Sequence, residues 1–146
     1  MNYQSMITPS ICIADQPTES DLRDLDAQGY VGIVNLRNEG EPEQPLSVAA
    51  EGELVSSLGL EYLHIPVGGA ISPGGVEKLV AFLDKHSGEK VLVHCRKGGR
   101  AAAMVLIVEA LANGWTAAEA FEKGPRMGLQ VDGGLRNLVE LALQKS

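Results

Sequence analysis

The sequence has few cysteines, few aromatic residues and no long apolar run. Its 146 residues include two cysteines, Cys12 and Cys95. Two are too few for a disulfide framework and lack the paired spacing of a zinc site, so we expect reduced thiols and no metal. Aromatic residues make up only 4% of the chain, so aliphatic side chains must fill the core. No apolar run reaches the roughly 18 residues that a membrane-spanning helix needs.

Basic residues are also in the minority. Twelve Lys and Arg face nineteen Asp and Glu, which gives a net charge of -7. Such a field repels nucleic acid and anionic membranes, so we expect neither as a partner, and an anionic ligand has to be captured locally. The N-terminus has no basic-then-apolar signal pattern, so we expect a cytoplasmic protein. Nothing in the sequence indicates a cofactor or an oligomeric state.

Short apolar segments alternate with helical patterns along the chain. The predicted strands are 11–14, 31–36, 61–67 and 91–93. Helices are predicted from Thr18 to Gly29, from 46 to 58, from an N-cap at Ser72 and Pro73 to about residue 86, over 101–111, from Thr116, and over 135–143. The long crossovers between strands imply mostly parallel pairing. We therefore predict one α/β domain over residues 1–146, with a central, mostly parallel sheet of four to five strands and helices on both faces.

The segment after the strand 91–93 carries the strongest chemical pattern. Gly98 and Gly99 are expected to supply positive φ values, which let consecutive amide N–H groups point at one anion. The helix that follows adds a partial positive charge at its N-terminus. Arg96 and Lys97 add two cations. Cys95 therefore lies where a thiolate is favoured.

Arg100 completes this loop. Its guanidinium can bind two oxygens of a phosphoryl group at once, which a lysine cannot do. Ligands of parallel sheets bind at the carboxyl ends of the strands, where this loop falls. The pattern therefore predicts an oxyanion cradle with a nucleophilic cysteine.

The segment from Val91 to Arg100 resembles the signature of cysteine-dependent protein tyrosine and dual-specificity phosphatases. It is most similar to the bacterial beta-lactamase-hydrolase-like phosphatase family. In that family, segments like Asn35-Leu36-Arg37 and His64 to Val67 recur, so the similarity covers roughly residues 8–145. The resemblance implies a dual-specificity-phosphatase-like fold and a phosphorylated small molecule or phosphoprotein as substrate.

The resemblance also implies roles for the residues of the loop. Cys95 would be the nucleophile that forms a cysteinyl-phosphate, and Arg100 would bind the phosphate and the transition state. The amides of Arg96, Lys97, Gly98 and Gly99 would form the cradle. His94 would support the loop from behind.

Three departures from the family pattern bear on activity. Four residues separate Cys95 from Arg100, where the larger phosphatase families have five. Ala101 follows the arginine in place of the usual Ser or Thr, whose hydroxyl helps the thiolate to leave. The segment 68–75 has no carboxylate to act as general acid. Glu39 or Glu41 could replace that acid, although acidic residues in such a loop are more often a solvated surface.

Three functions therefore stay open. The leading hypothesis is a phosphomonoester hydrolase of low activity. The shorter loop resembles that of rhodanese-type sulfurtransferases, in which Cys95 would carry a persulfide. A non-catalytic phosphate-binding module is the third alternative, since the acid and the hydroxyl are missing.

Overall fold

The computed structural model describes residues 1–144 and has a five-stranded sheet with helices on both faces. The strands are β1 (Gln4–Met6), β2 (Ile11–Ala14), β3 (Tyr30–Asn35), β4 (Glu61–His64) and β5 (Lys90–His94). The helices are α1 (Glu19–Ala27), α2 (Val48–Ser57), α3 (Gly75–Lys85), α4 (Gly99–Asn113), α5 (Ala117–Lys123), the 3₁₀ helix η1 (Gly124–Met127) and α6 (Leu135–Gln144).

The sheet has the strand order β1-β2-β5-β3-β4. The pairs β2–β5, β5–β3 and β3–β4 are parallel, whereas β1 pairs antiparallel with β2. The predicted mostly parallel sheet is thus confirmed, with β5 at its centre. Strand β1 was not predicted because three half-polar residues carry no periodic pattern. Strand β4 lies at an edge of the sheet and ends before Pro66. This agrees with the sequence, because proline has no amide hydrogen to donate to a neighbouring strand.

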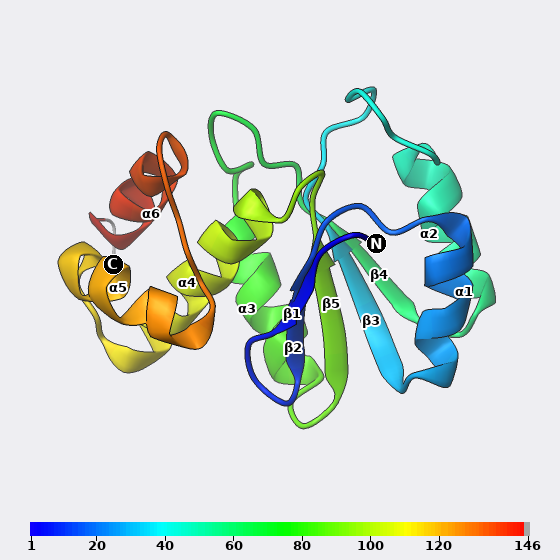
Figure 1. The fold of residues 1–146 in the computed structure, drawn as a ribbon, viewed down its shortest axis with the longest axis horizontal. Helices are drawn as coiled ribbons and strands as arrows, with labels where there is room; N and C mark the ends of the chain where they lie inside the picture. Colours follow the sequence, from blue (N-terminus) through cyan, green and yellow to red (C-terminus); the bar gives the residue numbers. More distant parts are fainter. Residues whose placement is uncertain (145–146) are drawn as a thin grey trace.

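Helices cover the two faces of the sheet with separate apolar cores (Figure 1). On one face, α1 and α2 bury Leu22, Leu25 and Val55 against β2, β3 and β5. On the other face, α3 and α4 pack on the sheet, and α5 and α6 pack on α4. Helix α4 is buried over 101–107 on every side, as its continuous apolar sequence predicted.

Two predicted helix starts are confirmed and one is wrong. Thr18 and Thr116 both form capping boxes with the third residue of their helices. Ser72 and Pro73, however, are not the N-cap and first residue of α3. The Gly75 N–H donates to the Ser72 carbonyl at 2.9 Å, and Gly74, in the left-handed region at φ 72°, is the N-cap. A turn closed by a glycine therefore delays the helix by two residues.

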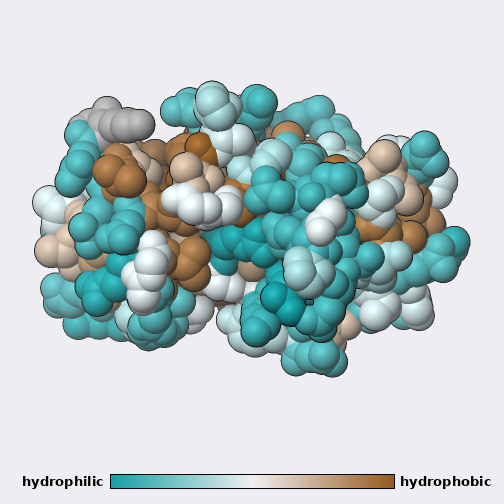
Figure 2. Space-filling model, turned by 90° about the horizontal axis from the view of Figure 1, so that it is seen from above, coloured by the Kyte–Doolittle hydropathy of each residue, from teal (hydrophilic) through white to brown (hydrophobic). Residues whose placement is uncertain are grey.

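Hydrophilic side chains cover much of the face seen from above, and apolar ones gather toward the left of that view, where Figure 1 has α5 and α6 (Figure 2). Within residues 1–144, no single helix has the length and apolarity needed to cross a membrane. Helix α4 and the segment 117–127 pass that test only as a pair, by length and composition, and they are bent by 115°.

Candidate active site

The cysteine loop lies between β5 and α4, at the carboxyl end of the central strand. Both neighbouring strands hold its backbone. The Cys95 N–H donates to the Ala14 carbonyl at 3.3 Å, and the Leu36 N–H donates to the His94 carbonyl at 2.9 Å. The Gln16 N–H also donates to the Arg96 carbonyl at 3.2 Å. Three backbone hydrogen bonds, two from the end of β2 and one from the end of β3, therefore hold the loop before any side chain is considered.

Gly98 shapes the loop around the sulfur. Its φ is +102°, and its N–H donates to the Cys95 Sγ at 3.1 Å. A Cβ at this position would lie 2.9 Å from the ring of Tyr3, so a side chain there would have to displace Tyr3 as well as adopt a strained backbone conformation. Since Gly98 is the N-cap of α4, the sulfur lies at the positive end of a 15-residue helix. Both features direct positive electrostatic potential toward the sulfur.

Gly99 does not have the positive φ that the sequence suggested. It is the first residue of α4, and its φ is outside the left-handed region. The structure gives it a different reason to be glycine, because a Cβ would lie 2.9 Å from Cδ1 of Leu135. The close approach of α6 to the loop therefore depends on this glycine.

Arg100 lies at the other end of the loop with its guanidinium already bound. Its two terminal nitrogens donate to the two carboxylate oxygens of Glu41 at 2.7 and 2.8 Å, and one of them also donates to the Val67 carbonyl at 2.9 Å. These bonds raise the pKa of Arg100. Glu41 thus holds the Arg100 guanidinium by the same bidentate geometry with which arginine binds phosphate.

Glu41 is ionised at neutral pH. Its hydrogen bonds to Arg100 outweigh the effect of burial and, with those to the Asn38 N–H and Arg37, lower its pKa to about 2. A group with this pKa is a poor proton donor near pH 7. Glu39 accepts from the Val48 N–H at 3.0 Å and so satisfies the first turn of α2. In this arrangement both carboxylates have partners other than a leaving group, and their proposed acid role stays a prediction.

Sequence reasoning gave no site role to Arg37, which the structure buries completely. Its guanidinium donates to Glu41 at 3.0 Å, to the Gln16 Oε1 at 2.8 Å, and to the carbonyls of Pro42 and Glu43. The acidic loop 37–45 thus wraps around this one cation. The sequence sign of this ion-pair cluster was an arginine directly after a strand, followed by three glutamates within six residues.

Glu51 was also missed. Its carboxylate lies 2.8 Å from the Nε2 of His94, and both side chains are buried, at 1% and 0% exposed. Burial would raise the pKa of Glu51, but the charge of His94 and hydrogen bonds to His94, Gln16 and Tyr62 lower it overall. His94 is therefore buried at the end of β5 with a carboxylate partner from α2, and its role as a support of the loop stays a prediction. A glutamate four residues before the buried Val55 was the only sequence sign.

A hollow of about 420 Å³ opens onto the loop. It is lined by Gly68, Cys95, Arg96, Lys97, Gly99, Arg100 and Leu135. Five of the predicted loop residues therefore share one concave surface. Arg96 at its rim is ion-paired with Glu43. Within the described part of the chain, no group of three His, Cys, Asp or Glu side chains could hold a metal ion.

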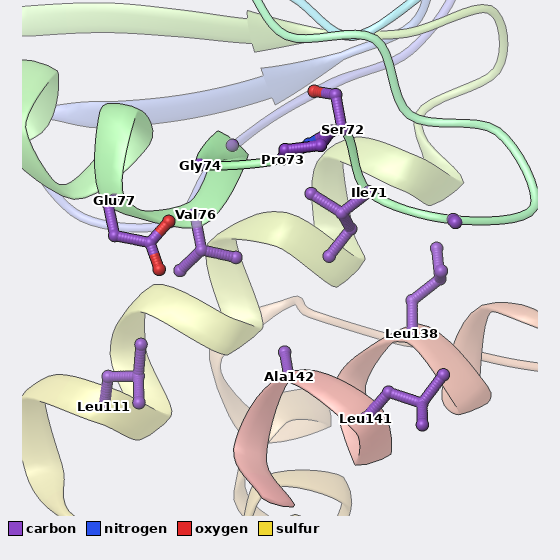
Figure 3. Close-up of a pocket in the computed structure, with 12 residues that line it drawn as sticks. Ile71, Ser72, Pro73, Gly74, Val76, Glu77, Leu111, Leu138, Leu141 and Ala142 are labelled. Atoms are coloured by element: carbon purple, nitrogen blue, oxygen red, sulfur yellow. The ribbon is translucent and has the colours of Figure 1, made fainter. Parts of the chain in front are cut away.

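A second, largely apolar groove of about 390 Å³ is lined by residues 70–77 and by side chains of α4 and α6. Figure 3 shows Ile71 and Val76 on one side of it, and Leu138, Leu141 and Ala142 of α6 on the other. Leu141 is 55% exposed there. The lining of the groove includes no cysteine, histidine, lysine or arginine and shares no residue with the hollow at the cysteine loop, so the two are separate.

The comparison with known families decides the relationship. Residues 4–112 match the family described as "Beta-lactamase hydrolase-like protein, phosphatase-like domain". The chain belongs to this family. Beta-lactamase hydrolase-like proteins of Agrobacterium fabrum and Xylella fastidiosa are 34% and 32% identical to it over 107 residues, which is 72% of this chain and 24% of each relative. The match therefore spans about a quarter of the length of these curated relatives.

Solved structures show that the family fold is that of dual-specificity-type phosphatases. The structure of PTPMT1 has a TM-score of 0.77 and 19% identity, covering 98% of this chain and 95% of that one. Tk-PTP in its active form has a TM-score of 0.75 and 22% identity, covering 97% and 96%. At these identities the likeness concerns the fold, and it confirms the predicted phosphatase-like architecture of this family member.

Proposed function

We propose that this phosphatase-like domain hydrolyses phosphomonoesters through a cysteinyl-phosphate on Cys95. The observation that carries the proposal is the pairing of a sulfur, hydrogen-bonded by the Gly98 N–H at the N-terminus of α4, with a pre-oriented Arg100 in the same hollow. A substrate oxyanion would replace or share the Glu41 partner of Arg100. The substrate, a phosphorylated small molecule or a phosphoprotein, and the cytoplasmic location stay predictions.

The reaction would run in two displacement steps. The Cys95 thiolate attacks phosphorus, so that a P–S bond forms while the P–O bond to the leaving group breaks. Water then attacks the phosphorus, the P–S bond breaks, and inorganic phosphate and the thiolate are released. The leaving oxygen takes its proton from water, because Glu41 is ionised and segment 68–75 has no carboxylate. Aryl phosphates should therefore react much faster than alkyl phosphates.

Kinetics with para-nitrophenyl phosphate test this proposal. Replacement of Cys95 by serine should abolish hydrolysis, whereas Cys12→Ala should retain it, because Cys12 lies in the opposite apolar core. Equal activity of Cys95→Ser and the unmodified protein would contradict the mechanism. Tight phosphate binding without turnover on any ester would favour the non-catalytic module instead.

A sulfurtransferase is the second candidate, favoured by the four-residue spacing between Cys95 and Arg100. The thiolate would attack the outer sulfur of thiosulfate, the S–S bond would break, and sulfite would leave. The intact mass of the protein after incubation with thiosulfate distinguishes the two. A gain of one sulfur atom on Cys95, with no hydrolysis of phosphoesters, would replace the phosphatase proposal.

A further inference from the structure

The apolar groove next to the cysteine loop takes no part in the reaction proposed above. Its volume is about 390 Å³, and it is lined by the start of α3, the end of α4 and one face of α6. Four large apolar side chains are exposed in the described part of the chain, and two of them, Leu111 and Leu141, line this groove. Exposed apolar surface that gathers in one hollow is typical of a binding surface, whereas scattered apolar residues are not.

The groove and the hollow at the cysteine loop share one helix. Leu135, the first residue of α6, lines the hollow, and Leu138, Leu141 and Ala142 line the groove. Their spacing of three, six and seven residues from Leu135 places these side chains along one side of the helix. An apolar stripe on α6 therefore runs from the hollow that holds the nucleophile into the groove.

The segment 68–75 is the second wall that the hollow and the groove have in common. Gly68 lines the hollow, whereas Ile71 lines the groove, across from Leu138 (Figure 3). The backbone fixes this wall, since the Ser72 N–H donates to the Pro66 carbonyl at 3.1 Å. The two depressions have different linings, yet they adjoin along α6 and this segment. A ligand whose phosphate lies in the hollow can therefore extend into the groove.

The helix sets the distance that such a ligand has to cover. Leu141 follows Leu135 by six positions, which is about 9 Å along the axis of α6 at a rise of about 1.5 Å per residue. An extended peptide spans about 3.3 Å per residue, so about three residues cover this distance. A phosphorylated residue in the hollow therefore places a side chain about three positions away over the groove.

One charged side chain lies at the groove. Glu77 lines it from the first turn of α3, next to Val76, and has no ion-pair partner among residues 1–144 (Figure 3). A negative charge beside apolar surface is complementary to a basic side chain and repels an anionic headgroup. The groove therefore fits a chain segment in which a basic residue follows an apolar one.

We propose that the apolar groove docks a phosphorylated protein segment, with an aliphatic side chain about three residues from the phosphorylated residue and a basic side chain beyond it. This rests on the proposed function in taking the cysteine loop as the phosphate site. A protein segment fits better than a membrane lipid, because the net charge of -7 and Glu77 both repel anionic bilayers. The groove then adds binding energy that the phosphate alone does not supply.

The test compares two phosphotyrosine peptides, since an aryl phosphate depends least on a general acid. One carries leucine three residues before and three residues after the phosphotyrosine, with a lysine beyond each leucine. The other has serine in place of both leucines. The kcat/KM of the leucine peptide should be about tenfold higher, as partial burial of one leucine allows. Equal values for the two peptides would overturn the proposal.

Substitutions in the groove show where this preference arises. Leu141→Ser should reduce the ratio of the two kcat/KM values from about ten to about two. Glu77→Gln should lower the kcat/KM of the leucine peptide about threefold, within the range of a surface ion pair. Met6→Ser is the matched control, because Met6 is also an exposed apolar side chain but lies on β1, outside the groove. A ratio that stays near ten in folded Leu141→Ser would overturn the docking role.

A binding measurement separates this proposal from the proposed function. The two peptides are labelled with fluorescein, and their binding to Cys95→Ser is followed by fluorescence polarisation, which needs no turnover. Tighter binding of the leucine peptide, with no ester hydrolysed by the unmodified protein, would support the docking role and contradict the hydrolase. Equal binding of the peptides, with hydrolysis of para-nitrophenyl phosphate, would do the reverse.

Two other occupants of the groove would each overturn the proposal. Sedimentation that shows a dimer for the unmodified protein and a monomer for Leu141→Ser would identify the groove as an interface between two copies of the chain. Equal kcat/KM values for the two peptides, together with stronger inhibition by decyl phosphate than by butyl phosphate, would assign the groove to a lipid chain.

Discussion

Replacement of Glu41 by glutamine should destabilise the protein in a pH-dependent way. The carboxylate joins Arg100 and the fully buried Arg37, and its pKa is lowered from 4.5 to about 2. Each pKa unit corresponds to about 1.4 kcal/mol of differential interaction. The lowering of the pKa by about 2.5 therefore sets an upper limit of about 3.5 kcal/mol on the contribution of ionised Glu41 at pH 7, and the contribution is smaller where water screens the pair.

The direction with pH follows from the lowered pKa. A carboxyl whose pKa is lower in the folded protein stabilises it fully above its unfolded value of about 4.5. This stabilisation is lost as the pH falls toward 2. The free energy of unfolding of Glu41→Gln should thus lie about 2–3 kcal/mol below that of the unmodified protein at pH 7, and the gap should close between pH 4.5 and 2.

Urea unfolding of both proteins at several pH values measures this gap. Glu43→Gln is the control from the same loop, because Glu43 makes only a surface pair with Arg96 and should change stability little. A gap that stays constant from pH 7 to pH 2 would refute the reasoning, since it would show that Glu41 acts through its shape rather than its charge. No gap at pH 7 would refute it as well.

Two further substitutions test the loop itself. Gly98→Ala should cost about 1–3 kcal/mol for the positive φ, plus the displacement of Tyr3, and should weaken phosphate binding. Gly59 is the control, because its φ is +81° and an added Cβ would have no atom within 4 Å. In thermal melts, Gly59→Ala should therefore lose only the stability that the positive φ costs. Equal losses of stability in the two variants would contradict the steric argument. Ala101→Ser should speed breakdown of the cysteinyl-phosphate about fivefold, as one new hydrogen bond of about 1 kcal/mol allows, and should reduce the burst in rapid mixing with para-nitrophenyl phosphate. An unchanged burst would count against the hydroxyl's role.

The fold could be predicted where local pattern decides it. The strands 31–36 and 91–93 and the capping threonines Thr18 and Thr116 were found because apolar periodicity and capping chemistry act over a few residues. The start of α3 was misplaced because Ser72 and Pro73 have the right residue types for a helix start. The outcome was decided by a turn ending at Gly74 that no such pattern reveals.

The residues of the cysteine loop could be predicted from the sequence, but the side chains that contact the loop from other elements could not. The position of Cys95 at the N-terminus of a buried helix follows from the order of strand, glycines and helix. The partners of the loop, Glu51 and Gln16, come from distant segments, and Glu51 lies 43 residues from His94. Such contacts depend on how α2 packs against the sheet. The ion pair between Glu41 and Arg100, 59 residues apart, is of the same kind and changes the expected chemistry of Glu41.

The most direct test of the account is to trap the covalent intermediate. Para-nitrophenyl phosphate is mixed with the protein, the reaction is quenched in acid within its first turnover, and the intact and peptide masses are measured. We expect one phosphoryl group on the peptide that contains Cys95, and none in Cys95→Ser. Absence of this adduct under conditions where the ester is hydrolysed, or a phosphoryl group on another residue, would contradict the claim that Cys95 is the nucleophile.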